Sequence, residues 1–279
     1  MAQPYPSLES PRAKIEWAAK HFEVLDGEGR TWEESHPYRL WGHLNRETLK
    51  YVGGLAVEPK PPRELSLVLG DYVHNLRSAL DHLVWQLVIA NRQVPGKRNK
   101  FPIAATKAEW RDQVENGGWL KGVHPDAVAI IKRLQPCSGK GPPSDHLLAG
   151  LNILDISDKH HVLATGALGI PSPFIKQDEW GFRGCRGTGA LASITLRWPL
   201  SVIEDNAEFV TFSFTSISPD FEMEMNDDFR GIQLRFGETG KLEEFSASLD
   251  ELAKMGYAVQ YVVDQFDPSP PKRAVQIVE

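Results

Sequence analysis

The segment 70–85, GDYVHNLRSALDHLVW, combines an apolar stripe with an unusual set of polar residues. Its large aliphatic residues recur at steps of three and four, which is the spacing of one face of an α-helix. The remaining positions contain no Lys or Glu, the residues that favour a plain solvated surface, and instead contain His, Arg, Asp, Asn and Ser. We therefore predict a long helix over residues 63–91 with a buried apolar stripe and polar residues that do more than contact water.

The polar residues of this helix are suited to proton transfer and to anion binding. Histidine exchanges protons near neutral pH, and arginine binds phosphates and carboxylates through its planar guanidinium group. At about 100° per residue, His74, Ser78 and Asp81 fall on one side of the helix, with Arg77 and His82 at the margins of that side. The candidate catalytic residues are Arg77, His82, His74 and Asp81, and the supporting candidates on this helix are Asn75 and Ser78.

A second polar helix is predicted over residues 147–163, LLAGLNILDISDKHHVL, with Ser144 as its N-cap. Steps of three and four place several of its polar residues on one face. We predict that the two helices are adjacent and that their polar faces share a cleft. The simpler alternative is that Asp155 and Lys159 form an ordinary surface ion pair. The supporting candidates on this helix are Asn152, Asp155, Lys159 and His160.

Composition places the chain among folded proteins that do not span a membrane. Of its 279 residues, 41% are hydrophobic and 24% are charged, a balance that allows a large core. No apolar run reaches the roughly 18 residues that a membrane helix needs, and the first residues lack the pattern of a signal peptide. We therefore expect a cytoplasmic protein with no membrane partner.

The charge balance excludes a protein that attracts nucleic acid over its whole surface. The net charge is −6, so a nucleic-acid partner requires a local basic patch. The densest candidate is the segment 96–100, GKRNK, in the loop after the first polar helix. Other basic residues follow it in the sequence, namely Arg111, Lys121, Lys132 and Arg133.

The order of patterns along the chain predicts an α+β fold. An N-terminal helical bundle begins with a helix over residues 11–25, capped by Ser10 and Pro11, and contains a hairpin insertion over residues 38–57. Alternating segments over residues 191–200, 208–217 and 229–236 predict an antiparallel β-rich region, and residues 248–266 predict a C-terminal helix. The predicted divisions are a helical domain over 1–165, a sheet and helix over 166–267, and a disordered tail over 268–279.

The motifs HNLRSALDHL and DKHH, separated by FPI and LQP, resemble those of an uncharacterised bacterial family that is common in actinobacteria. The spacing from Arg77 to His82 also resembles the R-x4-6-H motif of HEPN ribonucleases. That resemblance implies a HEPN-like helical bundle, a homodimer, and RNA cleavage without a metal or other cofactor. In such enzymes the arginine and histidine line a cleft at the dimer interface and promote attack of the ribose 2′-hydroxyl on the adjacent phosphate.

Three functions therefore remain open from the sequence. The first is HEPN-like cleavage or binding of single-stranded RNA, in which Arg77 stabilises phosphate charge and His82 transfers protons. The second is a metal-dependent or small-molecule enzyme, in which histidines and aspartates of the two polar helices hold a divalent transition metal such as zinc, manganese or iron. The third is a scaffold or interaction protein whose Arg77, Asp81, Asp155 and Lys159 form a buried ionic network.

Overall fold

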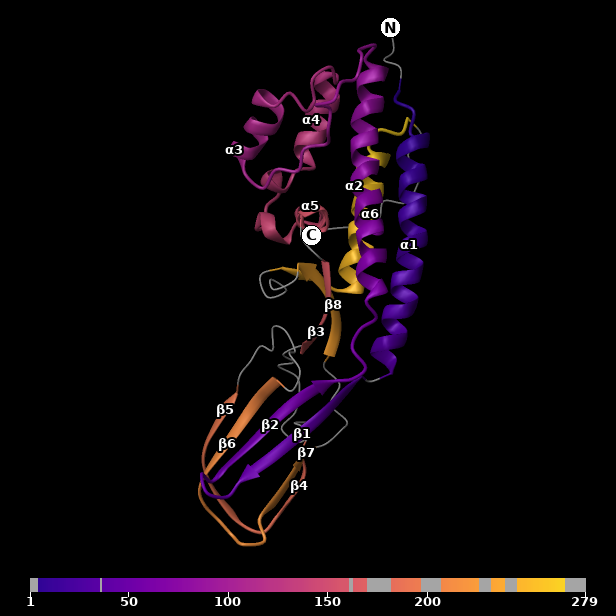
Figure 1. Ribbon diagram of the computed structural model, residues 1–279. Helices are drawn as coiled ribbons and strands as arrows, with labels where there is room; N and C mark the ends of the chain where they lie inside the picture. Colours follow the sequence, from indigo (N-terminus) through magenta and orange to yellow (C-terminus); the bar gives the residue numbers. More distant parts are fainter. Residues whose placement is uncertain are drawn as a thin grey trace.

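A computed structural model describes residues 5–35, 37–160, 163–169, 182–196, 207–225, 232–238 and 245–268. The molecule is elongated, with a helical part at one end and antiparallel strands at the other (Figure 1). Its mixed α and β content and its N-terminal helical part confirm the predicted α+β class. Within the described residues, no helix is both long and apolar enough to span a membrane.

Three long helices form the main bundle: α1 (Glu9–Glu34), α2 (Glu64–Ala90) and α6 (Leu249–Asp264). Helix α2 packs against both α1 and α6, and its apolar stripe supplies the centre of the hydrophobic core. The Tyr72 hydroxyl donates a hydrogen bond of 2.6 Å to the Leu252 carbonyl, and burial raises the pKa of this hydroxyl. The predicted C-terminal helix is therefore a member of the bundle.

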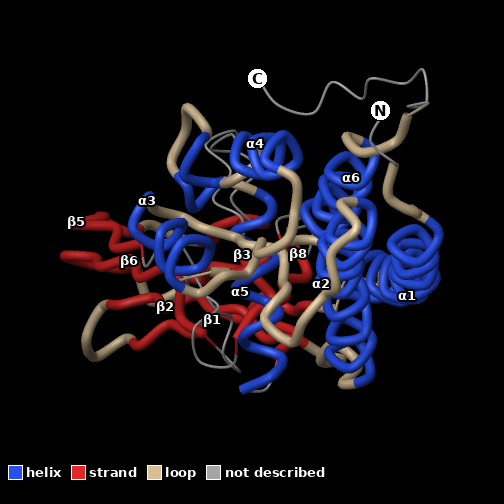
Figure 2. The backbone as a smooth tube through the Cα atoms, turned by 90° about the horizontal axis from the view of Figure 1, so that it is seen from above, coloured by secondary structure: helices blue, strands red, loops and turns tan. Residues whose placement is uncertain are grey.

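Short helices cover the side of α2 that lies away from α1, as both backbone views show (Figures 1 and 2). They are connected to α2 by the loop 91–106, which contains the FPI sequence. A longer helix, α5 (Leu147–His160), follows them and packs against α2 and α6. The short elements are α3 (Lys107–Trp110), the π-helix Arg111–Asn116, α4 (Pro125–Arg133), and the 3-10 turns Pro136–Ser138 and Pro143–Asp145.

The strands form antiparallel sheets that join distant parts of the sequence. The hairpin of β1 (Tyr38–Asn45) and β2 (Lys50–Val57) extends into a four-stranded sheet, because β2 pairs with β6 (Ala207–Ile217), which pairs with β5 (Gly189–Leu196). The other strands are β3 (Leu163–Gly169), β8 (Ile232–Glu238) and β9 (Ser246–Ala247), which form one sheet, and the pair β4 (Phe182–Arg186) and β7 (Glu222–Met225).

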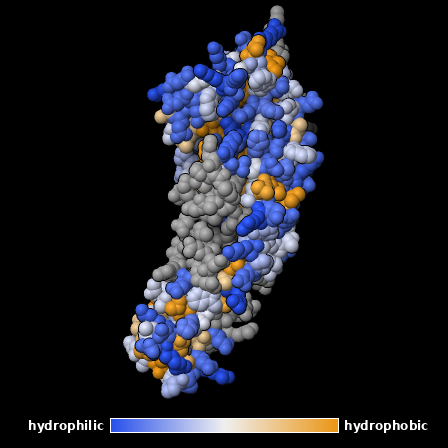
Figure 3. Space-filling view, viewed as in Figure 1, coloured by the Kyte–Doolittle hydropathy of each residue, from blue (hydrophilic) through white to orange (hydrophobic). Residues whose placement is uncertain are grey.

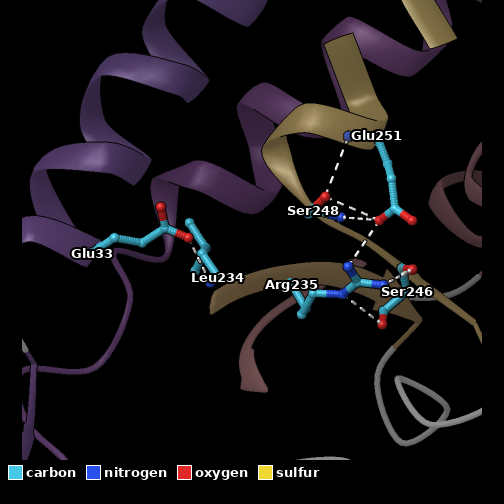
Figure 4. A network of polar contacts seen from close by, with 6 residues as sticks. All are labelled: Glu33, Leu234, Arg235, Ser246, Ser248 and Glu251. Atoms are coloured by element: carbon cyan, nitrogen blue, oxygen red, sulfur yellow. Dashed lines mark hydrogen bonds and ion pairs between the residues drawn. The ribbon is translucent and has the colours of Figure 1, made fainter. Parts of the chain in front are cut away.

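A polar network connects β8 to two helices of the bundle (Figure 4). The Leu234 N–H of β8 donates to the Glu33 carboxylate of α1, at 2.8 Å. The neighbouring Arg235 forms an ion pair of 2.8 Å with Glu251, whose carboxylate also accepts from the Ser248 N–H in a capping box at the start of α6. The bond between Glu33 and Leu234 therefore joins residues on the two sides of the predicted domain boundary near residue 165. The boundary itself stays a prediction.

The predicted bounds of two helices were wrong. Helix α1 runs from Glu9 to Glu34 rather than over residues 11–25. The Ser10 hydroxyl bonds His82 instead of capping the helix, and the buried Trp32 lies near its other end. Helix α5 begins at Leu147 and ends at His160 rather than Leu163, which starts β3. The backbone N–H of Leu148, the second residue of α5, donates to the Nδ1 of the His146 ring at 3.2 Å. The capping side chain is therefore His146 and not Ser144. The predicted disordered tail lies, from residue 269 onward, outside the described residues.

We expect Leu80→Ala to lower the free energy of unfolding by about 2–5 kcal/mol, because Leu80 is fully buried on α2 and its loss leaves a cavity. Leu67→Ala is the matched control on the same helix, since the Leu67 side chain is 73% exposed. Chemical denaturation followed by circular dichroism measures both. Equal stabilities of the two variants would contradict the packing described for α2.

Candidate functional site

The polar residues of α2 point in three directions and contact three different neighbours. Arg77 and Asp81 contact Phe101, the first residue of the FPI sequence. Asn75 and His82 contact α1. His74 lies on the remaining side, where α5 packs against α2. The predicted adjacency of the two polar helices is confirmed, but only part of the polar set of α2 faces α5.

Arg77 and Asp81 bond both backbone polar groups of one residue of the connecting loop, Phe101. The Arg77 Nη2 donates to the Phe101 carbonyl at 2.7 Å, and the Phe101 N–H donates to the Asp81 Oδ1 at 2.8 Å. The same Asp81 oxygen lies 3.1 Å from the Arg77 Nη1, as an ion pair outside hydrogen-bond geometry. Because the Arg77 residue is only 7% exposed, its guanidinium group is committed to this contact.

His82 and Asn75 connect α2 to α1. The His82 Nδ1 lies 2.6 Å from the Ser10 hydroxyl, and the Lys14 ammonium donates to the Asn75 side-chain oxygen at 3.1 Å. Partial burial lowers the pKa of His82, and the positive charge of Lys14 lowers it further, while Asp81 acts in the opposite direction. The structure therefore favours a neutral His82 that is bonded to α1.

His74 lies with a group of acidic residues where α5 meets α2. Its ring Nε2 is 3.4 Å from the Ser78 hydroxyl, a long contact on an exposed surface. Partial burial and the charge of Asp155 raise the pKa of Asp158, whereas His74 lowers it and Asp71 raises it. Asp158 was not among the predicted site residues. Asp158 lies against Gly70, where a Cβ atom would collide with the Asp158 carboxylate. This contact depends on how α5 packs on α2, which the spacing of residues in the sequence does not determine.

The other predicted residues of α5 have separate environments. Lys159 forms an ion pair of 2.6 Å with Asp155, as the simpler alternative expected, although Asp155 itself is buried. Asn152 is half-buried on the same helix. His160 is the last residue of α5, and its side chain lies outside the described part of the structure.

Arg77 and His82 have different hydrogen-bond partners within the chain, although Asp81, which pairs with Arg77, also acts electrostatically on His82. Arg77 contacts the connecting loop, whereas His82 contacts α1. Among the described residues, no group of three His, Cys, Asp or Glu side chains is arranged to hold a metal ion. The predicted homodimer, in which a second copy completes the cleft, stays a prediction.

A hollow of about 630 Å³ lies beside the loop that Arg77 and Asp81 hold. We call it the basic hollow, and its lining includes Lys97, Arg98 and Lys121, with Glu115 as its acidic residue. Glu115 lies 4.0 Å from Arg111 in an exposed ion pair, so its charge is partly offset. The predicted basic segment 96–100 and the later Lys121 thus meet at one surface.

Hydrogen bonds from one side chain fix the shape of the basic hollow. The Asn99 amide donates to the carbonyls of Trp119 and Lys121, at 3.1 and 2.9 Å, and its oxygen accepts from the Gly96 N–H at 2.8 Å. Gly118 lines the hollow with a φ of +68°, a conformation that a residue with a side chain rarely adopts. The loop is therefore organised before any ligand binds.

Sequence reasoning did not identify Asn99 as the residue that organises this loop. Asparagine favours turns through bonds between its side chain and nearby backbone groups, and this was the available signal. Its bonds to Trp119 and Lys121 could not be predicted, because they connect segments about twenty residues apart. Comparison with known protein families, with curated proteins and with solved structures found no match.

We expect Arg77→Leu to lower the free energy of unfolding by about 2–4 kcal/mol, because it leaves the Phe101 carbonyl and the Asp81 carboxylate without their buried partner. His74→Ala, on an exposed position of the same helix, is the control and should change stability by less than about 0.5 kcal/mol. Urea denaturation measures both. An Arg77→Leu variant as stable as the wild type would show that the Phe101 contact does not stabilise the fold.

Stability should also fall as the pH is lowered from 7.5 to 5.5. Burial lowers the pKa of both His82 and His146 in the folded protein, so the unfolded chain binds protons more readily. The stability that the two neutral histidines contribute to the folded protein is fully present above the unfolded histidine pKa of about 6.5 and is lost as the pH falls below it. His82→Gln should therefore reduce the pH dependence of the unfolding free energy, and adding His146→Gln should reduce it further. An unchanged dependence in the double variant would contradict this explanation.

Proposed function

We propose that this protein binds single-stranded RNA through the basic hollow. The observation that carries the proposal is a preorganised concave surface with three basic side chains in a chain whose net charge is −6. The surrounding surface of the α3 and α4 region is mainly hydrophilic in the view of Figure 3. Basic side chains gain affinity for nucleic acids by releasing counterions from phosphates, and a local concentration of them is sufficient for this effect.

Basic charge is combined with apolar and aromatic surface near the hollow. Val94 lines the basic hollow and is 93% exposed. Close to the hollow, the Lys100 ammonium lies 5.9 Å from the centre of the Trp119 ring. Single strands present unstacked bases to such surfaces, whereas a duplex presents mainly its phosphates. Gln93 and Asn116 also line the hollow, and side-chain amides are donors and acceptors of the kind that a ribose 2′-hydroxyl requires.

The contacts of the motif residues support binding rather than cleavage as the proposed activity. Arg77 is buried against the Phe101 carbonyl, and His82 is bonded to Ser10, so neither side chain faces the basic hollow through a recorded contact. In this proposal Arg77 and Asp81 are positioning residues, which fix the chain next to Lys100. HEPN-like cleavage is the competing outcome, and the experiment below distinguishes it.

Fluorescence anisotropy with a labelled single-stranded RNA tests the proposal. We expect replacement of Lys97, Arg98 and Lys121 by Gln to weaken binding by at least about tenfold. It should also reduce the slope of log affinity against log salt by about 2, since each phosphate contact on a single strand contributes roughly 0.7. The matched control replaces the exposed residues Lys50, Arg63 and Lys254 by Gln, which changes the net charge equally.

Equal binding by the two triple variants would overturn the basic hollow as the RNA site. A single-stranded DNA of the same sequence should bind more weakly, because it lacks the 2′-hydroxyl. RNA that is cut in the presence of EDTA, with loss of cutting in His82→Ala, would support the HEPN-like mechanism and contradict a role limited to binding.

A further inference from the structure

A second cavity, of about 550 Å³, lies where the C-terminal ends of α2 and α6 meet the N-terminal end of α4. We call it the helix-end cavity, and it does not include any of the polar motif residues discussed above. Its volume is in the range of sites that bind small molecules. Asn91 lines this cavity and donates a hydrogen bond of 2.9 Å to the carbonyl of Gly122, which lines the basic hollow, so the two sites adjoin.

The walls of the helix-end cavity are largely apolar. Leu87 and Phe266, which are 5% and 7% exposed, form part of the lining together with Ala127 and Ile130 of α4. An apolar wall of this kind binds the hydrocarbon part of a ligand by removing it from water. The ligand therefore needs an apolar body rather than being a small inorganic ion.

Polar groups around the cavity favour a positive ligand. Asp126, Asp267 and His124 line the cavity, as do Tyr5 and Phe266, and aromatic rings attract cations. The cavity also lies at the C-terminal ends of α2 and α6, where the helix dipole is negative, and at the N-terminal end of the shorter α4, where it is positive. Arg12 pairs with both Asp264 and Asp267, and the Asp126 carboxylate lies 3.6 Å from the His124 ring.

We propose that the helix-end cavity binds an organic ammonium ion with an apolar body. The hydrocarbon part contacts Leu87, Ala127 and Phe266, and the ammonium group lies toward the carboxylates at the cavity. A carboxylate of the same shape meets like charge at the same position and binds more weakly. The proposal does not depend on the proposed RNA function, because none of the three cations of the basic hollow lines this cavity.

Isothermal titration calorimetry with n-hexylammonium, n-hexanoate and n-hexanol tests the proposal. We expect the ammonium ion to bind at least about tenfold more tightly than the carboxylate, with the alcohol between them. Asp126→Asn should weaken ammonium binding by about threefold to tenfold, since it removes one nearby negative charge. Asp145→Asn, at an exposed position in a different loop, is its charge-matched control.

Ala127→Trp fills the cavity and should abolish binding of the ammonium ion and of the alcohol. Ala129→Trp is the matched control, because Ala129 lies on the same helix α4 at an exposed position outside the cavity lining. Binding that survives Ala127→Trp would overturn the site. Equal affinities for ammonium and carboxylate in the wild type would overturn the proposed charge preference, and this result does not depend on whether any variant folds.

Discussion

The contact of Arg77 and Asp81 with the Phe101 peptide is the interaction on which the helical end of the molecule depends. It joins the most buried helix to the start of the chain that forms α3, α4 and the basic hollow. A buried arginine is costly unless its charge is paired, and here the Asp81 carboxylate forms an ion pair with it while the Phe101 carbonyl accepts from its Nη2. The two side chains thus bond both the donor and the acceptor of a single residue and fix its position relative to α2.

Other polar residues of α2 fix its remaining neighbours in the same way. His82 and Asn75 contact α1 through Ser10 and Lys14. The polar residues of α2 are therefore distributed among contacts with several different neighbours. Three basic side chains line the basic hollow instead, and two aspartates line the adjoining helix-end cavity.

Periodicity predicted the helices well, because a buried stripe at steps of three and four is a local property of the chain. The bounds of α2 and the hairpin of β1 and β2 followed from such local patterns. The partners of polar side chains did not, since they depend on distant segments. Ser10 was expected to cap α1, but it bonds His82, seventy-two residues away. Arg77 was selected for its chemistry, yet its partner Phe101 offers only a backbone carbonyl, which no side-chain pattern reveals.

Hydrogen–deuterium exchange in the variant Asp81→Ala tests the central claim most directly, with Ser78→Ala as the control on the same helix. If Asp81 and Arg77 hold the connecting loop, exchange in Asp81→Ala should become faster at the amides of residues 96–101 and 119–121. The interior amides of α2 should keep their protection, and Ser78→Ala should exchange as the wild type does. If exchange at the amides of residues 96–101 and 119–121 in Asp81→Ala is the same as in the wild type, the account is contradicted.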